Sequence, residues 1–191
     1  YATVAEGLRN DLDGELKVLW MQGFAGTAPV MQGDQGFRDA IAEMDGIELA
    51  TQPQDGNYAT APTLDIVKAL IQGGLEFNVA IGGSQEMTAG IIQALKEENI
   101  PLDDVAIVTV NGGPTDVEAF KAGELDFALS QSPGLHGMIC AANLIAYMKG
   151  ETYQTKSYSP VVWIDSSNWE ENLIPWGVDA AWFPVVDHFV E

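Results

Sequence analysis

The stretch IGGSQEMTAGIIQAL, residues 81–95, gives the clearest indication of the fold class. It continues an apolar run that begins at Phe77, and it passes through Gly82, Gly83 and Ser84 directly into apolar residues at helical spacing. Serine is common immediately before a helix, because its hydroxyl accepts a hydrogen bond from a free amide of the first turn. A buried strand that leads at once into a helix is typical of a parallel α/β sheet.

The same unit recurs along most of the chain. Strands are predicted at residues 16–21, 47–51, 77–81, 105–110 and 125–129, and helices at 32–44, 62–73, 84–97 and 115–122. Apolar residues flank both sides of each strand, which is typical of strands covered by helices on both faces. The sequence therefore predicts a doubly wound α/β fold with a mostly parallel sheet.

Charge excludes some partners. Eight lysines and arginines stand against 28 aspartates and glutamates, for a formal net charge of −20. A chain this acidic repels phosphate groups, so we expect no nucleic-acid partner. It contains no run of 18 apolar residues, so no membrane span is predicted.

No enzyme motif stands out. Metalloprotease, nucleophile-elbow and P-loop patterns are absent from the sequence. His136 and His188 lie far apart, and His136 is interpreted as a helix-end residue. Cys140 is the single cysteine and is predicted to be a small packed apolar residue. We therefore expect no catalytic residue, no metal site and no cofactor.

Small and polar residues follow four of the predicted strands, at 22–27, 82–85, 111–114 and 130–133. Each of these junctions can be explained alone as a turn or a helix cap. In an open parallel sheet, however, the carboxyl ends of the strands meet at one edge, where ligands bind. Together the four junctions predict a polar binding edge.

Four segments resemble one known family, and they occur in the same order: GELKVLWMQGFAGTAPVMQGDQGFRDAI, LIQGGLEFNVAIGGSQEMTAGIIQAL, VAIVTVNGGPTDVEAFKAGELDFALSQSPGLHG and LIAYMKGE. Over residues 15–168 the chain resembles the C-terminal lobe of type I periplasmic solute-binding proteins, the ribose- and galactose-binding group of ABC transporters. The resemblance implies reversible binding of a sugar or polyol, a membrane permease as partner, and a periplasmic or other extracytoplasmic location. It also implies an upstream lobe that precedes this chain.

The resemblance, together with the strand ends, gives the candidate ligand-binding residues Gly33, Asp34, Tyr58, Ser84, Gln85, Asn111 and Gln131. Four of these depart from the family. Gly33 stands where the family has an arginine, and Asn111 stands where it has an aspartate. Ser84 and Gln85 stand where the family often has asparagine followed by aspartate. Amides and hydroxyls still suit a sugar, and an aromatic face suits the apolar side of its ring. The departures leave the identity of the pentose or hexose open.

Two segments are predicted, residues 1–168 as the binding lobe and residues 169–191 as a tryptophan-rich tail. The lobe includes an amphipathic helix at 133–150, which in the family crosses to the upstream lobe, and a returning strand at 159–164. Without that lobe, the apolar stripe of the helix needs another cover. The tail could fold over it, but we favour a homodimer through helix 133–150.

The sequence leaves two other functions open. One is the effector-binding core of a LacI-type regulator, which shares the fold but would need a DNA-binding headpiece; the charge of −20 disfavours it. The other is the sensory ectodomain of a receptor, which the sequence does not separate from a transport protein.

Overall fold

A largely parallel sheet forms the centre of the computed structural model, which describes residues 2–131, 133–158 and 161–173. The strands are β1 (Leu16–Gln22), β2 (Ile47–Leu49), β3 (Gln54–Asp55), β4 (Val79–Gly82), β5 (Ala106–Asn111), β6 (Phe127–Ser130) and β7 (Val162–Ile164). Their order is β2-β1-β4-β5-β6-β7, and β3 also pairs with β1. Only the pairing of β6 with β7 is antiparallel among the described strands. The predicted fold class is confirmed.

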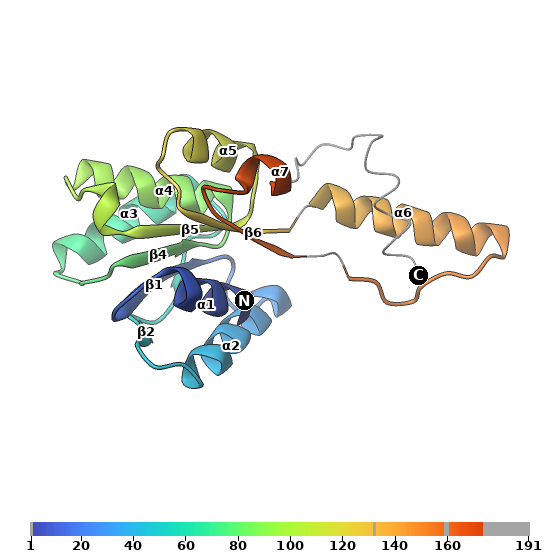
Figure 1. Ribbon diagram of the computed structural model, residues 1–191, viewed down its shortest axis with the longest axis horizontal. Coiled ribbons are helices and arrows are strands. Elements are labelled where there is room, and N and C mark those ends of the chain that lie inside the picture. Colours follow the sequence, from blue (N-terminus) through green and yellow to red (C-terminus); the bar gives the residue numbers. More distant parts are fainter. Residues whose placement is uncertain (1, 132, 159–160, 174–191) are drawn as a thin grey trace.

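Helices cover both faces of the sheet (Figure 1). α1 (Ala2–Asp11) and α2 (Ala28–Ala42) lie on one face, and α3 (Thr60–Gln72), α4 (Gln85–Glu97) and α5 (Pro114–Lys121) lie on the other. A short 3-10 turn, η1 (Leu102–Asp104), precedes β5. Two further helices, α6 (Pro133–Lys149) and α7 (Trp169–Asn172), come after β6.

The sheet separates two apolar cores, because successive residues of a strand point to opposite faces. In β1, Val18 and Trp20 pack toward α1 and α2, whereas Leu19 and Met21 pack toward α3 and α4. The Trp20 ring meets the Phe37 ring edge to face at 4.9 Å between centroids. Both faces of each central strand are thus buried, as the apolar runs in the sequence indicated.

Three helices differ from the sequence-based expectation, and one of them is the short α7, for which no helix was predicted. α1 was not predicted; its buried residues Val4, Ala5 and Leu8 form a short apolar stripe that packs beside α2. α2 begins at Ala28, before the predicted start at residue 32. Pro29 lies in its first turn, where a proline removes no helical hydrogen bond, so this proline was the missed signal for the start.

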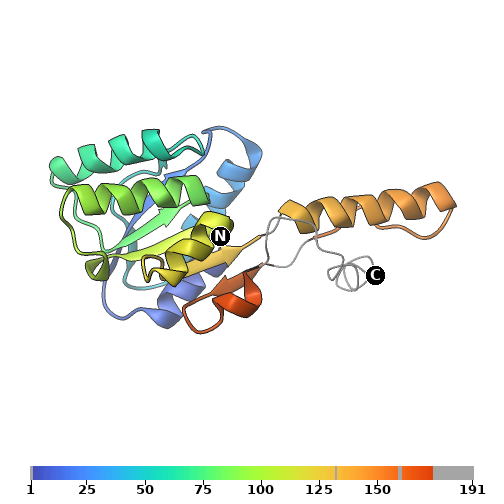
Figure 2. The same ribbon diagram turned by 90° about the horizontal axis from the view of Figure 1, so that it is seen from above.

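α6 extends away from the end of β6, and residues 151–158 return along it (Figures 1 and 2). Its first half is buried through Leu135, Met138 and Ile139. Its second half exposes apolar side chains, namely Leu144, Ile145, Tyr147 and Met148. At 3.6 residues per turn these exposed residues lie on one broad side of the helix, opposite Leu135 and Ile139, so the predicted stripe does not continue as a single buried face.

Two local predictions near α6 are corrected. Cys140 is exposed rather than packed, because helical spacing places it on the side of α6 opposite the buried Met138. The returning strand is Val162–Ile164, shorter than the predicted 159–164, of which residues 159–160 lie outside the described residues. No helix among the described residues is long and apolar enough to cross a membrane.

The predicted tail begins inside the packed lobe. The Trp169 ring stacks on Phe120 at 6.0 Å between centroids, and Leu173 is buried in the core on the α4 side. The rest of the tail, residues 174–191, lies outside the described residues. The division at residue 168 stays a prediction.

Candidate ligand-binding site

The carboxyl ends of the parallel strands meet at one edge of the sheet. The register pairs Met21 of β1 with Gly82 of β4, Gly82 with Thr109 of β5, and Asn111 of β5 with Ser130 of β6. A hollow of about 270 Å³ opens at this edge, and its lining is Pro29, Tyr58, Gly83, Asn111, Gln131, Pro133 and His136. Tyr58, Asn111 and Gln131 are therefore brought together as predicted.

Asn111 and Gln131 supply the amide groups of the hollow. Asn111 ends β5 with a φ of +86°, a conformation that asparagine tolerates better than most residues. Its carbonyl oxygen accepts a hydrogen bond from the Gln131 amide nitrogen at 3.3 Å. This bond ties the β5 and β6 junctions together, so the two side chains start from adjacent backbone positions.

Aromatic rings border the same edge. Tyr58 follows β3, and its ring lies over Gly23, where an added Cβ would come within 2.0 Å of the Tyr58 Cζ. The Phe24 ring meets it edge to face at 5.5 Å and remains about half exposed. Phe24 was missed as a site candidate, although it stands in the polar junction after the first strand. A sugar presents an apolar C–H face, which suits an aromatic ring, and hydroxyl groups, which suit amides.

His136 was also missed as a site residue. It lies in the first turn of α6 and lines the hollow. Its place near a helix end agrees with the interpretation from sequence. Its position in the sequence could have indicated this role, because α6 begins immediately after the β6 junction that carries Gln131.

Ser84 and Gln85 are used by the scaffold. The Ser84 hydroxyl caps α4 by accepting a hydrogen bond from Met87 N at 3.4 Å, and the residue is buried. Gln85 Oε1 accepts a hydrogen bond from Thr115 N at 3.0 Å, and its Nε2 donates to Glu86 Oε1 at 2.9 Å. Neither residue lines the hollow, although Gly83 beside them does.

Gly33 and Asp34 lie on α2 and do not line the hollow either. Gly33 is buried. The Asp34 carboxylate pairs with Arg38 one turn later, with 2.8 Å between Oδ1 and Nε, and Arg38 Nη2 also donates to Gln52 Oε1 at 2.8 Å. The i, i+4 spacing of Asp34 and Arg38 was visible in the sequence and indicates this ion pair.

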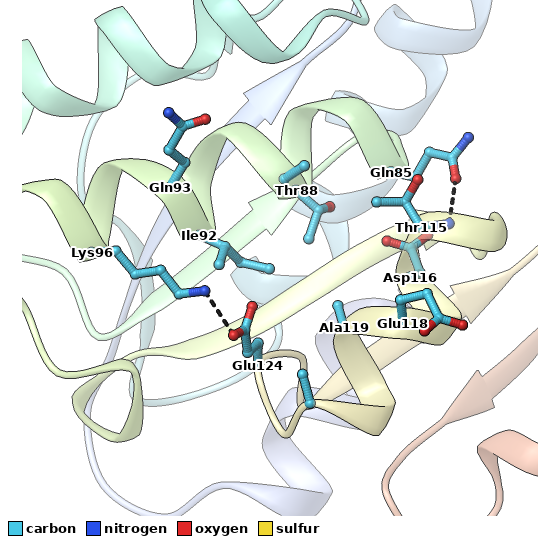
Figure 3. Close-up of a pocket in the computed structure, with 12 residues that line it drawn as sticks. Gln85, Thr88, Ile92, Gln93, Lys96, Thr115, Asp116, Glu118, Ala119 and Glu124 are labelled. Atoms are coloured by element: carbon cyan, nitrogen blue, oxygen red, sulfur yellow. Dashed lines mark hydrogen bonds and ion pairs between the residues drawn. The ribbon is translucent and has the colours of Figure 1, made fainter.

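A second concavity, of about 460 Å³, lies between α4 and α5 (Figure 3). An ion pair closes one end, with 2.7 Å between Lys96 Nζ and Glu124 Oε1. Near the other end, burial raises the pKa of Asp116 to about 7; hydrogen bonds from Gly113 N and Thr109 act in the opposite direction. Among the described residues, no cluster of three or more histidine, cysteine, aspartate or glutamate side chains could hold a metal ion.

Comparison with known proteins identifies the family. The profile of a family described as "Periplasmic binding protein domain" matches residues 2–152. The chain belongs to this family. Over 162 residues it is 28% identical to a putative rhizopine-binding protein of Rhizobium meliloti, and the matched region covers 84% of the chain and 52% of that protein. Over 145 residues it is 28% identical to a ribose import binding protein of Haemophilus influenzae, and the matched region covers 76% of the chain and 48% of that protein.

Solved structures agree on the fold. An ABC transporter periplasmic solute binding protein from Actinobacillus succinogenes, crystallised with bound D-allose, superposes with a TM-score of 0.80 at 18% identity, over 88% of this chain and 59% of that one. This periplasmic binding protein chain spans about half the length of the curated relatives it matches.

Proposed function

We propose that this chain forms one lobe of a solute-binding protein that captures a sugar or polyol reversibly for an ABC-transporter permease. The observation that carries the proposal is the hollow at the carboxyl edge of the sheet, which Asn111, Gln131 and Tyr58 line together. The names of the relatives, a rhizopine-binding and a ribose import binding protein, support the same class of ligand.

The hollow suits binding without catalysis. An amide side chain both donates and accepts hydrogen bonds, as each sugar hydroxyl does, so Asn111 and Gln131 can each bind adjacent hydroxyls. Tyr58 offers an apolar face for the C–H side of a ring. We infer no bond-breaking step at this site, and the proposed role is binding alone.

Location and partner follow from the transport role and belong to the same proposal. The protein would act in the periplasm or another extracytoplasmic compartment, and a permease would receive the ligand. A LacI-type regulator remains disfavoured, because a net charge of −20 opposes approach to DNA. A sensory role would use the same hollow, so the ligand test below applies to both roles.

The test is an NMR titration of the chain with D-ribose, D-allose and myo-inositol at concentrations up to tens of millimolar. We expect at least one of them to shift the side-chain amide signals of Asn111 and Gln131. Gln93 is the matched control, because it is exposed on α4 and does not line the hollow. Its side-chain amide donates a hydrogen bond to Glu97. Shifts at Gln93 that equal those at Asn111, or no shift with any of the three compounds, would argue against the proposal.

A further inference from the structure

Phe24 is an aromatic residue that the junction between β1 and α2 holds at the surface, beside the hollow. It is 53% exposed, although an aromatic ring ordinarily gains free energy from burial. Its ring meets the ring of Tyr58, which lines the hollow, edge to face at 5.5 Å between centroids. Phe24 itself is not part of that lining. The contact with Tyr58 thus connects Phe24 to the hollow.

The backbone of this junction is tied at Phe24. The carbonyl oxygen of Phe24 accepts two hydrogen bonds from Thr27, one from the amide nitrogen at 3.3 Å and one from the hydroxyl at 2.8 Å. Thr27 is the N-cap residue of α2, yet its side chain makes no capping hydrogen bond to that helix. Gly26 lies between them with a φ of +79°, which glycine adopts without strain. The turn therefore fixes the backbone that carries the exposed ring.

Tyr58 reaches the same place from the segment between β3 and α3, in a left-handed backbone conformation. Its φ is +55°, and so is that of Asn57. The Ala59 amide nitrogen donates a hydrogen bond to the Gly56 carbonyl oxygen at 3.0 Å, which closes the turn around these two residues. A bulky residue adopts such a φ at a cost and keeps it where the surrounding structure holds it. The turn thus sets the point from which the Tyr58 ring starts.

Packing, rather than a polar partner, directs the Tyr58 ring. Among the described residues, none forms a hydrogen bond with its hydroxyl. The ring lies over Gly23, where an added Cβ would overlap it, so the glycine leaves the space that the ring occupies. Phe24 meets the ring edge to face. Removal of the Phe24 ring would leave one side of Tyr58 without its aromatic neighbour.

We propose that Phe24 is a positioning residue that holds the Tyr58 ring as an apolar wall of the hollow, and that this wall makes the site prefer a cyclic sugar over its open-chain alcohol. A cyclic sugar presents several C–H groups on one rigid face, which suits an aromatic ring. An open-chain polyol must lose torsional freedom to present the same face. The amides of Asn111 and Gln131 can bind the hydroxyls of either compound. The ligand preference rests on the proposed function, whereas the role of Phe24 toward Tyr58 does not.

The first measurement needs no ligand. In NMR spectra of the whole chain, the ring current of Phe24 should displace the Tyr58 ring-proton signals from their ordinary positions. Phe24→Leu should remove most of this displacement, and Phe24→Tyr, which keeps a ring, should retain it. Tyr58 signals that are the same in the wild type and Phe24→Leu would overturn the proposal, and so would a Phe24→Tyr variant that behaves like Phe24→Leu.

Tyr147→Leu is the matched control. Tyr147 is 61% exposed, and its ring also meets a tyrosine, Tyr153, edge to face, at 5.3 Å between centroids. Neither of these two tyrosines lines the hollow. The control variant should leave the Tyr58 signals unchanged. A shift of the Tyr58 signals as large as that in Phe24→Leu would contradict a specific role of Phe24.

The second measurement compares each sugar with the open-chain alcohol formed by its reduction: D-ribose with ribitol, and D-allose with allitol. The side-chain amide signals of Asn111 and Gln131 report binding. We expect a sugar to bind at least about 3-fold more tightly than its alcohol, the size of one aromatic contact. In Phe24→Leu the ratio should fall to about 1, whereas Phe24→Tyr and Tyr147→Leu should keep it.

Equal binding of sugar and alcohol by the wild type, or a ratio that Phe24→Leu leaves unchanged, would overturn the ligand preference. No binding of any of the four compounds would contradict the sugar-binding proposal and the preference that rests on it. The ligand-free spectra would then still decide whether Phe24 positions Tyr58.

Discussion

Single residues at the binding edge adopt backbone conformations that most side chains avoid. Asn57 and Tyr58 have φ angles of +55°, Asn111 has +86° and Gly112 has +69°. Such angles cost of order 1 kcal/mol or more for a residue with a Cβ, and they persist where the surrounding packing holds them. Both the aromatic and the amide side of the hollow therefore start from constrained turns.

Gly112→Ala should destabilise the chain by about 2 to 4 kcal/mol, since the left-handed φ and a steric clash act together. An added Cβ would lie 2.5 Å from Leu173 Cδ1. Gly123→Ala is the control, because Gly123 has a similar φ of +67° but no atom within 4 Å of the added Cβ. Urea unfolding of both variants separates the two costs. Equal losses would show that Leu173 does not press on this turn.

Asp116 should also make stability depend on pH. Its pKa is about 7 when folded, against an ordinary 3.8, so the folded state binds more protons between these values. Stability from this group is present at low pH and is lost as the pH rises toward 7. Between pH 5 and pH 8 the wild type should lose about 2 to 3 kcal/mol relative to Asp116→Asn. Urea unfolding at the two pH values checks this, and a difference that does not change with pH would contradict it.

At the scale of elements, local signals predicted most of the fold. α4 was expected at residues 84–97 and spans Gln85–Glu97 behind its Ser84 cap, because the cap and the apolar spacing agree. α1 was missed, since its short stripe gains its cover only from α2 and the sheet.

The candidate site was harder to predict than the elements, because strand ends give position but not side-chain direction. Asn111 and Gln131 reach the hollow, whereas Ser84 and Gln85 turn back to cap and bridge helices. Asp34 is paired within α2. Phe24 and His136 stand at the correct junctions but were not chosen. The difference between residues that line the hollow and residues that bond to the scaffold lies in their hydrogen-bond partners, which depend on tertiary packing.

α6 presents the main exposed apolar surface described here. Ile145 and Met148 are 52% and 76% exposed, whereas Leu135 and Ile139 are buried against the chain's own residues. The predicted homodimer is therefore supported only through the second half of the helix and stays a prediction. Burial of a few such side chains at roughly 1.5 to 3 kcal/mol each is enough to drive weak association of the isolated chain.

Sedimentation equilibrium checks this prediction. The average mass of the wild-type chain should rise with concentration, and Met148→Glu should abolish the rise, because it places a charge in the apolar contact. Met31→Glu is the control, since Met31 is 60% exposed but belongs to α2 and not to α6. A wild-type chain that is monomeric at every concentration, or an equal effect of both variants, would exclude a dimer through α6.

At the scale of the whole molecule, we propose that the chain supplies one side of a binding site. The hollow is open and small, about 270 Å³, and the chain spans about half the length of its relatives. If a second lobe closes over the ligand, the isolated lobe lacks several hydrogen bonds. At about 1 kcal/mol each, these losses weaken binding by orders of magnitude.

Calorimetric titration measures directly whether tight binding needs a second lobe. The sugar that shifts Asn111 and Gln131 is titrated into this chain and into a longer protein in which the expected upstream lobe precedes it. We predict no micromolar binding by the chain alone and at least about a 100-fold tighter complex with both lobes, the equivalent of a few hydrogen bonds. Micromolar affinity of the isolated chain, or equal affinity of the two proteins, would contradict the account.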